Sequence, residues 1–374
     1  MSLVDLIKPH IRELAPYEPG KPIEQLEREL GVRDSIKLAS NENPLGPSPK
    51  AVEAMRAAAA EIHRYPDGAC FALRARLAER LGVHEAELVF GAGADEILEL
   101  IAKTVIGPGD EVVHAWPSFA MYPIVIQGMG GVGVPVPLTA DLVHDLDAMR
   151  QAVNERTRVV MLCNPNNPTG TSVGAEAFDR FVGSLPADVV LAVDEAYFEF
   201  ARRADFPDAV RWIRSRPGTI VLRTFSKVYG LAGIRIGYGV ADRELASYLE
   251  RARHPFNVNR LAEVAAVAAL DDEDHARRTL ELNAAGIEML TEALGRLGIE
   301  TWPSDANFIL ARTGADVYPR LLALGVIVRP MKGFGLGDCV RISIGLPEEN
   351  ERLVKALASL RAADRACGSG GAGA

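Results

Sequence analysis

Three features of the sequence predict an α/β fold with a mostly parallel sheet and a second, smaller domain. Between about residues 87 and 240, apolar segments typical of strands alternate with segments of helical periodicity. Several apolar segments are nearly continuous, which is typical of strands covered by helices on both faces. After about residue 255 the pattern changes to a long helical stretch and then to short strands with helices between them. We therefore expect a large α/β domain followed by a smaller α+β domain.

The strand candidates of the first part are apolar runs that end in turns or lead into helical segments. They are residues 87–90, 111–116, 132–138, 158–163, 189–196, 219–226 and 234–241. The helical segments between them are residues 94–105, 117–127, 145–153 and 174–185. This alternation is the pattern of a parallel sheet whose strands are connected by helices.

The remaining segments give four predicted parts of the chain. Residues 1–49 are Pro-rich and irregular, and we expect them to pack against the smaller domain. Residues 50–255 form the large domain and residues 256–366 the smaller one, with a long helical stretch broken near Asp271 and a last helix that begins at Pro347. The Gly-rich residues 367–374 are predicted to be a disordered tail.

Composition narrows the class of protein. The 374 residues carry a formal net charge of −9, which gives no sign of nucleic-acid binding. No run of eighteen apolar residues suggests a membrane span, and the N-terminus lacks the apolar run of a signal peptide. The four cysteines have no CxxC spacing, which favours a reduced, cytoplasmic chain. The seven histidines are scattered, and we expect no metal site.

Lys227 is the first candidate for chemistry. It follows a strand and precedes a turn of small residues, and Thr224, Ser226 and Arg235 around it suit an anion. An apolar approach and a nearby arginine lower the pKa of an amine and make it a better nucleophile toward an aldehyde. A single lysine in a loop is more often an ordinary surface residue, so this interpretation depends on the segments that accompany it.

Asp194 is the second candidate, because it stands at the end of a buried strand. Open α/β sheets place ligand contacts at the carboxyl ends of their strands. An aspartate that pairs with a pyridine nitrogen keeps that nitrogen protonated, and each pKa unit of this effect is worth about 1.4 kcal/mol. The alternative is a helix N-cap or a solvated acid.

Two turns complete the set. Residues 164–170, NPNNPTG, form a turn fixed by two prolines and a glycine, whose asparagine amides can point into a cleft. Residues 91–96, GAGADE, join a strand to a helix whose first N–H groups can bind an anion. Glu96 stands where the dinucleotide-binding fingerprint needs its third glycine, so a nucleotide-binding dehydrogenase is not favoured.

These four segments, in this order and spacing, resemble the fold-type I pyridoxal-phosphate aminotransferases. More narrowly, the chain is similar to the histidinol-phosphate aminotransferases, over nearly its whole length. The supporting segments are LAPYEPG (14–20), LASNENPLGPSP (38–49), RYPDG (64–68), DANF (305–308), VIVRP (326–330) and VRISIG (340–345). The resemblance implies a seven-stranded, mostly parallel sheet sandwiched by helices in a cofactor-binding large domain.

The resemblance also implies roles for the cofactor residues. Lys227 would hold pyridoxal 5′-phosphate as a Schiff base and later move the proton of the substrate carbon, and Asp194 would pair with the pyridinium nitrogen. Tyr197 and Asn167 would bind the cofactor's phenolic oxygen, and Phe119, where the family often has tyrosine, would stack on the ring. The implied phosphate ligands are Ser226, Arg235, the backbone amides of Ala94 and Asp95, and Tyr65 from a neighbouring subunit of a homodimer, with Thr224 as a further candidate for the same site.

The substrate residues are likewise implied by the resemblance. Arg341 resembles the arginine that binds a carboxylate, and Arg329 the arginine used for a substrate phosphate. The other implied substrate-binding positions are Tyr17, Asn43, Asn167 and Asn307. Two arginines suit a ping-pong cycle, because glutamate has two carboxylates while histidinol phosphate has a phosphate and none.

The predicted function is transamination between L-histidinol phosphate and 2-oxoglutarate, a step of histidine biosynthesis. An aromatic aminotransferase acting on phenylalanine is the main alternative, because a phosphate pocket and an aromatic pocket can differ by few residues. A threonine-phosphate decarboxylase would use the same cofactor machinery. A ligand-sensing domain of a transcription regulator is not favoured, because too few residues precede Ser40 for a helix-turn-helix.

Overall fold

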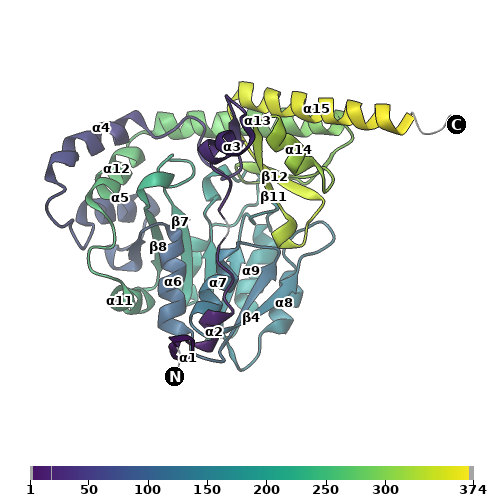
Figure 1. Cartoon of the computed structure of the whole chain (residues 1–374). Helices are drawn as coiled ribbons and strands as arrows, with labels where there is room; N and C mark the ends of the chain where they lie inside the picture. The colour runs from purple at the N-terminus through teal and green to yellow at the C-terminus, as the bar shows by residue number, and fades with distance from the viewer. Residues whose placement is uncertain (1–2, 18, 370–374) are drawn as a thin grey trace.

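Two sheets organise the chain in the computed structural model, which describes residues 3–17 and 19–369 (Figure 1). The larger sheet has seven strands in the order β2-β8-β7-β6-β5-β3-β4. Its strands are β2 (Leu88–Gly91), β3 (Glu111–Trp116), β4 (Val132–Pro137), β5 (Thr157–Cys163), β6 (Val190–Asp194), β7 (Thr219–Thr224) and β8 (Gly237–Ala241). Only β8 runs antiparallel to its neighbours β2 and β7, so the predicted seven-stranded, mostly parallel sheet is confirmed.

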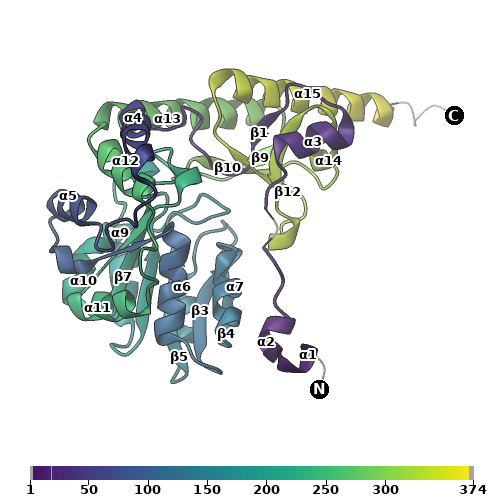
Figure 2. The same ribbon diagram turned by 60° about the vertical axis from the view of Figure 1, so that its left-hand side comes forward.

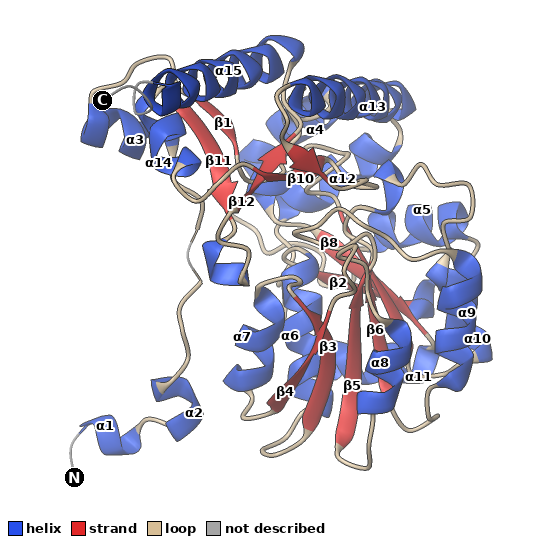
Figure 3. Ribbon diagram, turned by 90° about the vertical axis from the view of Figure 1, so that its right-hand side faces the viewer, coloured by secondary structure: helices blue, strands red, loops and turns tan. Residues whose placement is uncertain are grey.

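Helices cover both faces of this sheet, as Figure 3 shows. In β5 the side chains of Val159 and Met161 join one apolar core and those of Val160 and Leu162 join the other. This alternation explains the continuous apolar runs of the sequence, since both faces of a central strand are buried. One face packs on α6 (Ala94–Val105), α7 (Met121–Gly128) and α11 (Arg243–Ala252). The other packs on α5 (Phe71–Leu81), α8 (Leu146–Ala152), α9 (Ala175–Ser184), α10 (Trp212–Ser215) and α12 (Arg260–Leu270).

The smaller sheet has the strand order β1-β11-β12-β10-β9. Its strands are β1 (Ile36–Leu38), β9 (Glu300–Thr301), β10 (Phe308–Arg312), β11 (Val326–Pro330) and β12 (Cys339–Ser343). The helices that pack on it are α13 (Glu273–Arg296), α14 (Val317–Ala323) and α15 (Pro347–Ser369). The expected break near Asp271 is present, because α12 ends at Leu270 and Asp272 caps α13 through a bond from the His275 N–H.

The N-terminal residues run from α1 (Leu3–Leu6) and α2 (Pro9–Arg12) to α3 (Ile23–Leu30) beside the smaller sheet (Figure 2). The strand β1 pairs in parallel with β11 of the smaller sheet, and α3 packs beside it. The helices α1 and α2 lie instead beside the larger sheet, where the Gln127 amide donates to the carbonyl of His10. The helix α4 (Pro49–Ala58) packs on α12. Although α12 comes after residue 255, where the smaller domain was predicted to begin, its side chains belong to the core of the larger sheet.

The C-terminal segment differs from the expectation in part. Residues 367–369 were expected to begin a disordered tail, but they continue α15 to Ser369. Alanine and arginine, which favour a helix, dominate the preceding turns and carry it further than the glycines suggested. The rest of the predicted tail, residues 370–374, lies outside the described residues.

Candidate active site

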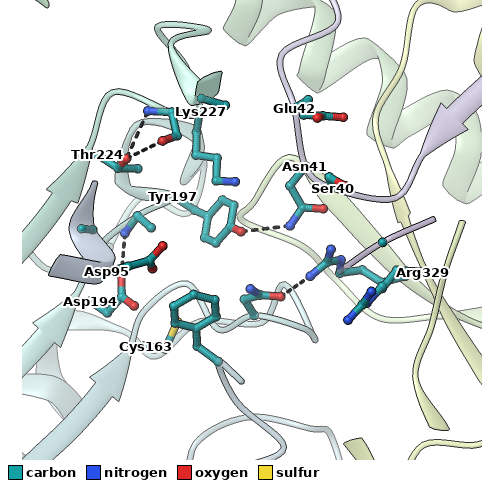
Figure 4. Close-up of a pocket in the computed structure, with 18 of the residues that line it drawn as sticks. Ser40, Asn41, Glu42, Asp95, Cys163, Asp194, Tyr197, Thr224, Lys227 and Arg329 are labelled. Carbon is teal, nitrogen blue, oxygen red and sulfur yellow. Dashed lines mark hydrogen bonds between the residues drawn. The ribbon is translucent and has the colours of Figure 1, made fainter. Parts of the chain in front are cut away.

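A cavity of about 290 Å³ lies where the carboxyl ends of β5, β6 and β7 face the smaller sheet (Figure 4). Residues of both sheets and of the N-terminal segment line it. They are Tyr17, Gly20, Ala39, Ser40, Asn41, Glu42, Ala94, Asp95, Phe119, Cys163, Asn167, Asp194, Ala196, Tyr197, Thr224, Ser226, Lys227, Ala232, Arg235, Arg329 and Arg341. Most residues singled out in the sequence are therefore brought to one place.

Lys227 enters the cavity from the loop after β7, and its Nζ lies 5.6 Å from the centre of the Tyr197 ring. Burial, and then the positive charge of Arg341, lower the pKa of its amine to about 8. Within the described part of the chain, no carboxylate forms an ion pair with it. A lysine in this state has a substantial neutral fraction near neutral pH and can act as a nucleophile or a base.

Asp194 ends β6, and its side chain is only 4% exposed. One carboxylate oxygen accepts the Tyr122 hydroxyl at 3.1 Å and the other accepts the Ala196 N–H at 3.1 Å. Burial raises the pKa of Asp194 to about 6, against the opposing effect of these two bonds. The carboxylate is thus held in one orientation, in surroundings where a cationic partner would bind it strongly.

An anion-binding corner lies at the start of α6. Gly93 precedes the helix with a φ of 89°, and a Cβ on Gly237 would lie 2.4 Å from the Ala94 nitrogen, so only glycine fits there. The Arg235 guanidinium is 3.1 Å from the Asp95 carboxylate, and the Thr224 hydroxyl donates to Ser226 Oγ at 3.0 Å. Free helix N–H groups, hydroxyls and an arginine are the donors that a phosphate prefers.

Arg341 stands on the opposite side, on β12, and is 8% exposed. Its guanidinium donates to the Asn167 side-chain oxygen at 2.5 Å and to the Ala39 carbonyl at 2.7 Å. Its buried Nε has no hydrogen-bond partner in the described part of the structure. Arg329, on β11, lies 5.9 Å from the Tyr17 ring centre at the same end of the cavity. Two guanidinium groups therefore face the cavity from the smaller sheet.

Three residues named in the sequence lie outside the cavity. The Asn43 amide donates to the Val228 carbonyl at 2.9 Å and to the Thr279 hydroxyl at 3.0 Å, so it ties the N-terminal loop to other segments. Asn307 lies behind the cavity wall and donates to the carbonyl of Asn41 at 3.0 Å. Tyr65 is 84% exposed and stacks on another exposed ring, Phe256, at 4.8 Å.

The sequence analysis missed several residues that contact the site, and Asn41 and Tyr122 are the most informative. Asn41 donates to the Tyr197 hydroxyl at 2.9 Å, and Tyr122 holds Asp194. The segment 40–43 has two asparagines, a residue type that tolerates positive φ, and Asn41 has a φ of 54°. This tolerance was the one sequence signal for an unusual backbone turn at Asn41. Nothing in the periodicity of α7 pointed Tyr122 toward Asp194.

Comparison with known proteins fits this geometry. The sequence profile of aminotransferases of class I and II matches residues 33–357. The chain belongs to this aminotransferase family. It is similar to histidinol-phosphate aminotransferase 2 of Pseudomonas aeruginosa, with 48% identity over 96% of this chain and 98% of that one. It is also similar to the histidinol-phosphate aminotransferase of Moorella thermoacetica, with 49% identity over 94% and 92% of the two chains.

Solved structures agree with the family assignment. The crystal structure of histidinol-phosphate aminotransferase from Sinorhizobium meliloti in complex with pyridoxal-5′-phosphate has a TM-score of 0.87 and 31% identity, over 96% of this chain and 98% of that one. The predicted fold-type I architecture of this aminotransferase is thereby confirmed. Among the described residues, no helix is long and apolar enough to cross a membrane, and no group of three or more metal-binding side chains occurs.

Proposed function

We propose that this aminotransferase uses pyridoxal 5′-phosphate to move an amino group between L-histidinol phosphate and 2-oxoglutarate. The observation that carries the proposal is the placement of Arg341 and Arg329 across one cavity from Lys227 and Asp194. The relatives named above, which share nearly half of their residues with this chain, are histidinol-phosphate aminotransferases.

The donor set fits the cofactor. Lys227 offers the amine for its aldehyde, Asp194 a buried acceptor for the ring N–H, and Ser226, Arg235 and the α6 N-terminus the donors for its phosphate, with Thr224 beside them. Phe119 lines the cavity and would cover the ring face. When bound, the cofactor supplies a ring that withdraws electrons from the substrate carbon. Asp194 favours that state by holding a positive charge on the ring nitrogen.

Asn167 and Tyr197 supply a pair of donors for the cofactor's phenolic oxygen. Because Arg341 can only donate, the Asn167 side-chain oxygen faces Arg341 and its NH₂ group is free to face the cavity. Burial raises the pKa of Tyr197, so its hydroxyl keeps its proton and can donate. Both groups are held before any ligand arrives, which is the preorganisation that a site for developing charge requires.

Lys227 would also move the substrate proton. Its pKa of about 8 would let Nζ accept a proton from the substrate carbon near neutral pH. The same amine would then return the proton to the cofactor carbon that carried the aldehyde. Lys227 lines a cavity between the two sheets, and its amine is buried there.

The two arginines would sort the substrates. Arg341 is buried, and its Nε has no hydrogen-bond partner among the described residues, which suits a guanidinium that would bind a carboxylate of glutamate or 2-oxoglutarate. Arg329, beside Tyr17, lies at the outer end, where a substrate phosphate or a second carboxylate can bind. One pocket can then accept both halves of the reaction in turn.

We also propose a homodimer in which Tyr65 reaches the neighbouring site. Tyr65 stacks on Phe256, and the nearby side chains of Ile62 and Phe71 are exposed by 64% and 67%. Such a cluster of exposed apolar side chains is typical of an interaction surface. Alanine at Tyr65 is expected to weaken cofactor binding while the fold is kept, measured by equilibrium dialysis.

A panel of amino donors with 2-oxoglutarate tests the proposed reaction. Glutamate formation, measured by a coupled assay, is expected to be fastest with L-histidinol phosphate. Faster turnover of phenylalanine would make the chain an aromatic aminotransferase, and release of carbon dioxide from threonine phosphate would make it a decarboxylase. Either result would overturn the substrate assignment but leave the family unchanged.

A further inference from the structure

The Tyr197 hydroxyl is held by residues of the smaller sheet, although Tyr197 follows β6 of the larger sheet. Asn41 Nδ2 donates to Tyr197 Oη at 2.9 Å, and Asn41 itself contacts Ser343, the last residue of β12. Asn41 is 1% exposed and Ser343 4% exposed. In Figure 4 the Asn41 amide points at the hydroxyl across the cavity wall. The Tyr197 hydroxyl is therefore one of the points at which residues of the two sheets contact each other.

The direction of each hydrogen bond follows from the chemistry of the partners. The Asn41 backbone N–H can only donate, so Ser343 Oγ accepts it, at 2.8 Å. The Ser343 hydroxyl then donates its own proton to the Asn41 side-chain oxygen, also at 2.8 Å. If the Asn41 amide were reversed, this buried proton would have no acceptor among the described residues. The Asn41 NH₂ group must therefore face Tyr197.

A consequence follows for the Tyr197 proton. Because Tyr197 Oη accepts from Asn41, its own O–H must donate elsewhere, and within the described residues no protein acceptor lies within hydrogen-bond distance of it. Burial raises the pKa of Tyr197, so the proton stays on the oxygen. The O–H is left to donate into the cavity, on the side where Lys227 enters.

The backbone of Asn41 is fixed for this task. Its φ of 54° lies in the left-handed region, which asparagine tolerates better than most residues. Its carbonyl accepts a hydrogen bond from the Asn307 side-chain amide at 3.0 Å. Ala306, the residue before Asn307, is fully buried in the core. Both ends of the residue are thus anchored to the smaller sheet, and its amide is not free to rotate.

We propose that Asn41 and Ser343 are positioning residues that fix the Tyr197 hydroxyl as a hydrogen-bond donor toward the cofactor's phenolic oxygen. This inference rests on the proposed function. The Tyr197 hydroxyl would stabilise negative charge on the phenolic oxygen. This effect is largest when that oxygen shares no proton with another group. Loss of the donor is therefore expected to raise the pH at which the bound cofactor changes its absorbance.

The test is Asn41→Asp, which keeps size and tolerates the same φ but cannot donate to Tyr197. Its carboxylate would accept the Tyr197 proton and turn it away from the cavity. The absorbance titration of the holoenzyme is expected to shift upward by about one pH unit or more, the range of one hydrogen bond to a charged group. An unchanged titration overturns the proposal.

Tyr197→Phe separates the hydrogen bond from the added charge. It is expected to give an upward shift of its own, and adding Asn41→Asp to it should then change the titration far less than Asn41→Asp does alone. Equal shifts in the two backgrounds would mean a charge effect only and would overturn the proposal. Wild-type protein that never takes up the cofactor is a different failure, since it contradicts the proposed function itself.

Ser343 variants test the same positioning role if Asn41→Asp does not fold. Ser343→Ala frees the Asn41 amide to reverse and is expected to shift the titration upward by a smaller amount, whereas Ser343→Thr keeps the hydroxyl and the wild-type titration. Thermal unfolding of each apoprotein shows whether the fold is kept. A wild-type titration in a folded Ser343→Ala variant contradicts the proposal.

Discussion

The two sheets contribute different chemistry to one cavity. The larger sheet supplies Lys227 and Asp194 from strand ends whose positions are set by neighbouring parallel strands. The smaller sheet supplies Arg341 and Arg329 from β12 and β11, and Asn41 from the loop after β1. The groups proposed to hold the cofactor thus lie mainly on the larger sheet, and the two arginines proposed to bind the substrate lie on the smaller one. Substitutions on the two sides should therefore fail in different ways.

The largest effect is expected for Lys227→Ala on the larger sheet. The amine is the proposed attachment point and proton carrier, so kcat should fall by about 10⁴-fold or more. Steady-state kinetics and the absorbance of the bound cofactor measure the two roles. Lys332→Ala, an exposed lysine of the smaller-sheet side, is the matched control and should behave as wild type. Near-normal activity of Lys227→Ala would remove the lysine from the mechanism.

Asp194→Asn should have the next largest effect. The amide keeps the shape but loses the charge that holds the ring nitrogen protonated, so kcat should fall by about 10²- to 10⁴-fold while cofactor binding weakens less. Single-turnover kinetics after loading with excess cofactor measure the chemical step. A normal rate constant would show that the ring charge is not needed.

Arg329→Ala on the smaller sheet should act on the substrate alone. Loss of a charged hydrogen bond to the phosphate should raise KM for L-histidinol phosphate about 10- to 100-fold, with the cofactor spectrum unchanged. Arg312→Ala, an exposed arginine paired with Glu300 and Asp338, serves as the control. A changed cofactor spectrum in Arg329→Ala would contradict the assignment of cofactor binding to the larger sheet and substrate binding to the smaller one.

The pH dependence of cofactor capture should follow Lys227. Burial lowers the pKa of its amine to about 8, so the neutral, reactive fraction grows as pH rises and is nearly complete above that value. The rate at which apoprotein captures the cofactor should therefore rise about tenfold per pH unit below pH 8 and level off above it. Stopped-flow absorbance measures this rate. A rate that keeps rising tenfold per pH unit up to pH 10 would contradict the lowered pKa.

The smallest effect is expected on the stability of the apoprotein. Burial raises the pKa of Asp194 to about 6 from 3.8, so the folded state resists ionisation and loses stability as pH rises between these values. Above pH 6, apoprotein with Asp194→Asn should unfold a few degrees higher than wild type, and below pH 4 the difference should vanish. Calorimetry at both pH values checks the sign.

The contrast between the sheets also explains what the sequence could predict. Lys227 and Asp194 follow apolar strands whose neighbours are close in the sequence, so their meeting at one sheet edge was predictable. The position of Asn41 depends on β1, three residues that pair with β11 almost 300 residues later. Local patterns carry no information about such a pairing. The resemblance implied Asn43, but it is the amide of Asn41 that contacts Tyr197 in the cavity.

Tyr122 was missed for a related reason. It appeared as one apolar position of a helical segment, and it does pack in the core between the rings of His114 and Phe119. Its hydroxyl donates to Asp194, which lies 72 residues later in the sequence, so the contact arises only from the tertiary fold. A buried tyrosine needs a partner for its hydroxyl, but periodicity does not say which one.

The most direct test of the account is chemical mapping of the lysine that binds the cofactor. Purified protein loaded with pyridoxal 5′-phosphate is reduced with borohydride, digested and analysed by mass spectrometry. The account predicts one modified lysine, Lys227, and no modification in the Lys227→Ala variant. A stable adduct at any other lysine, or protein that never takes on the colour of the bound cofactor, would contradict it.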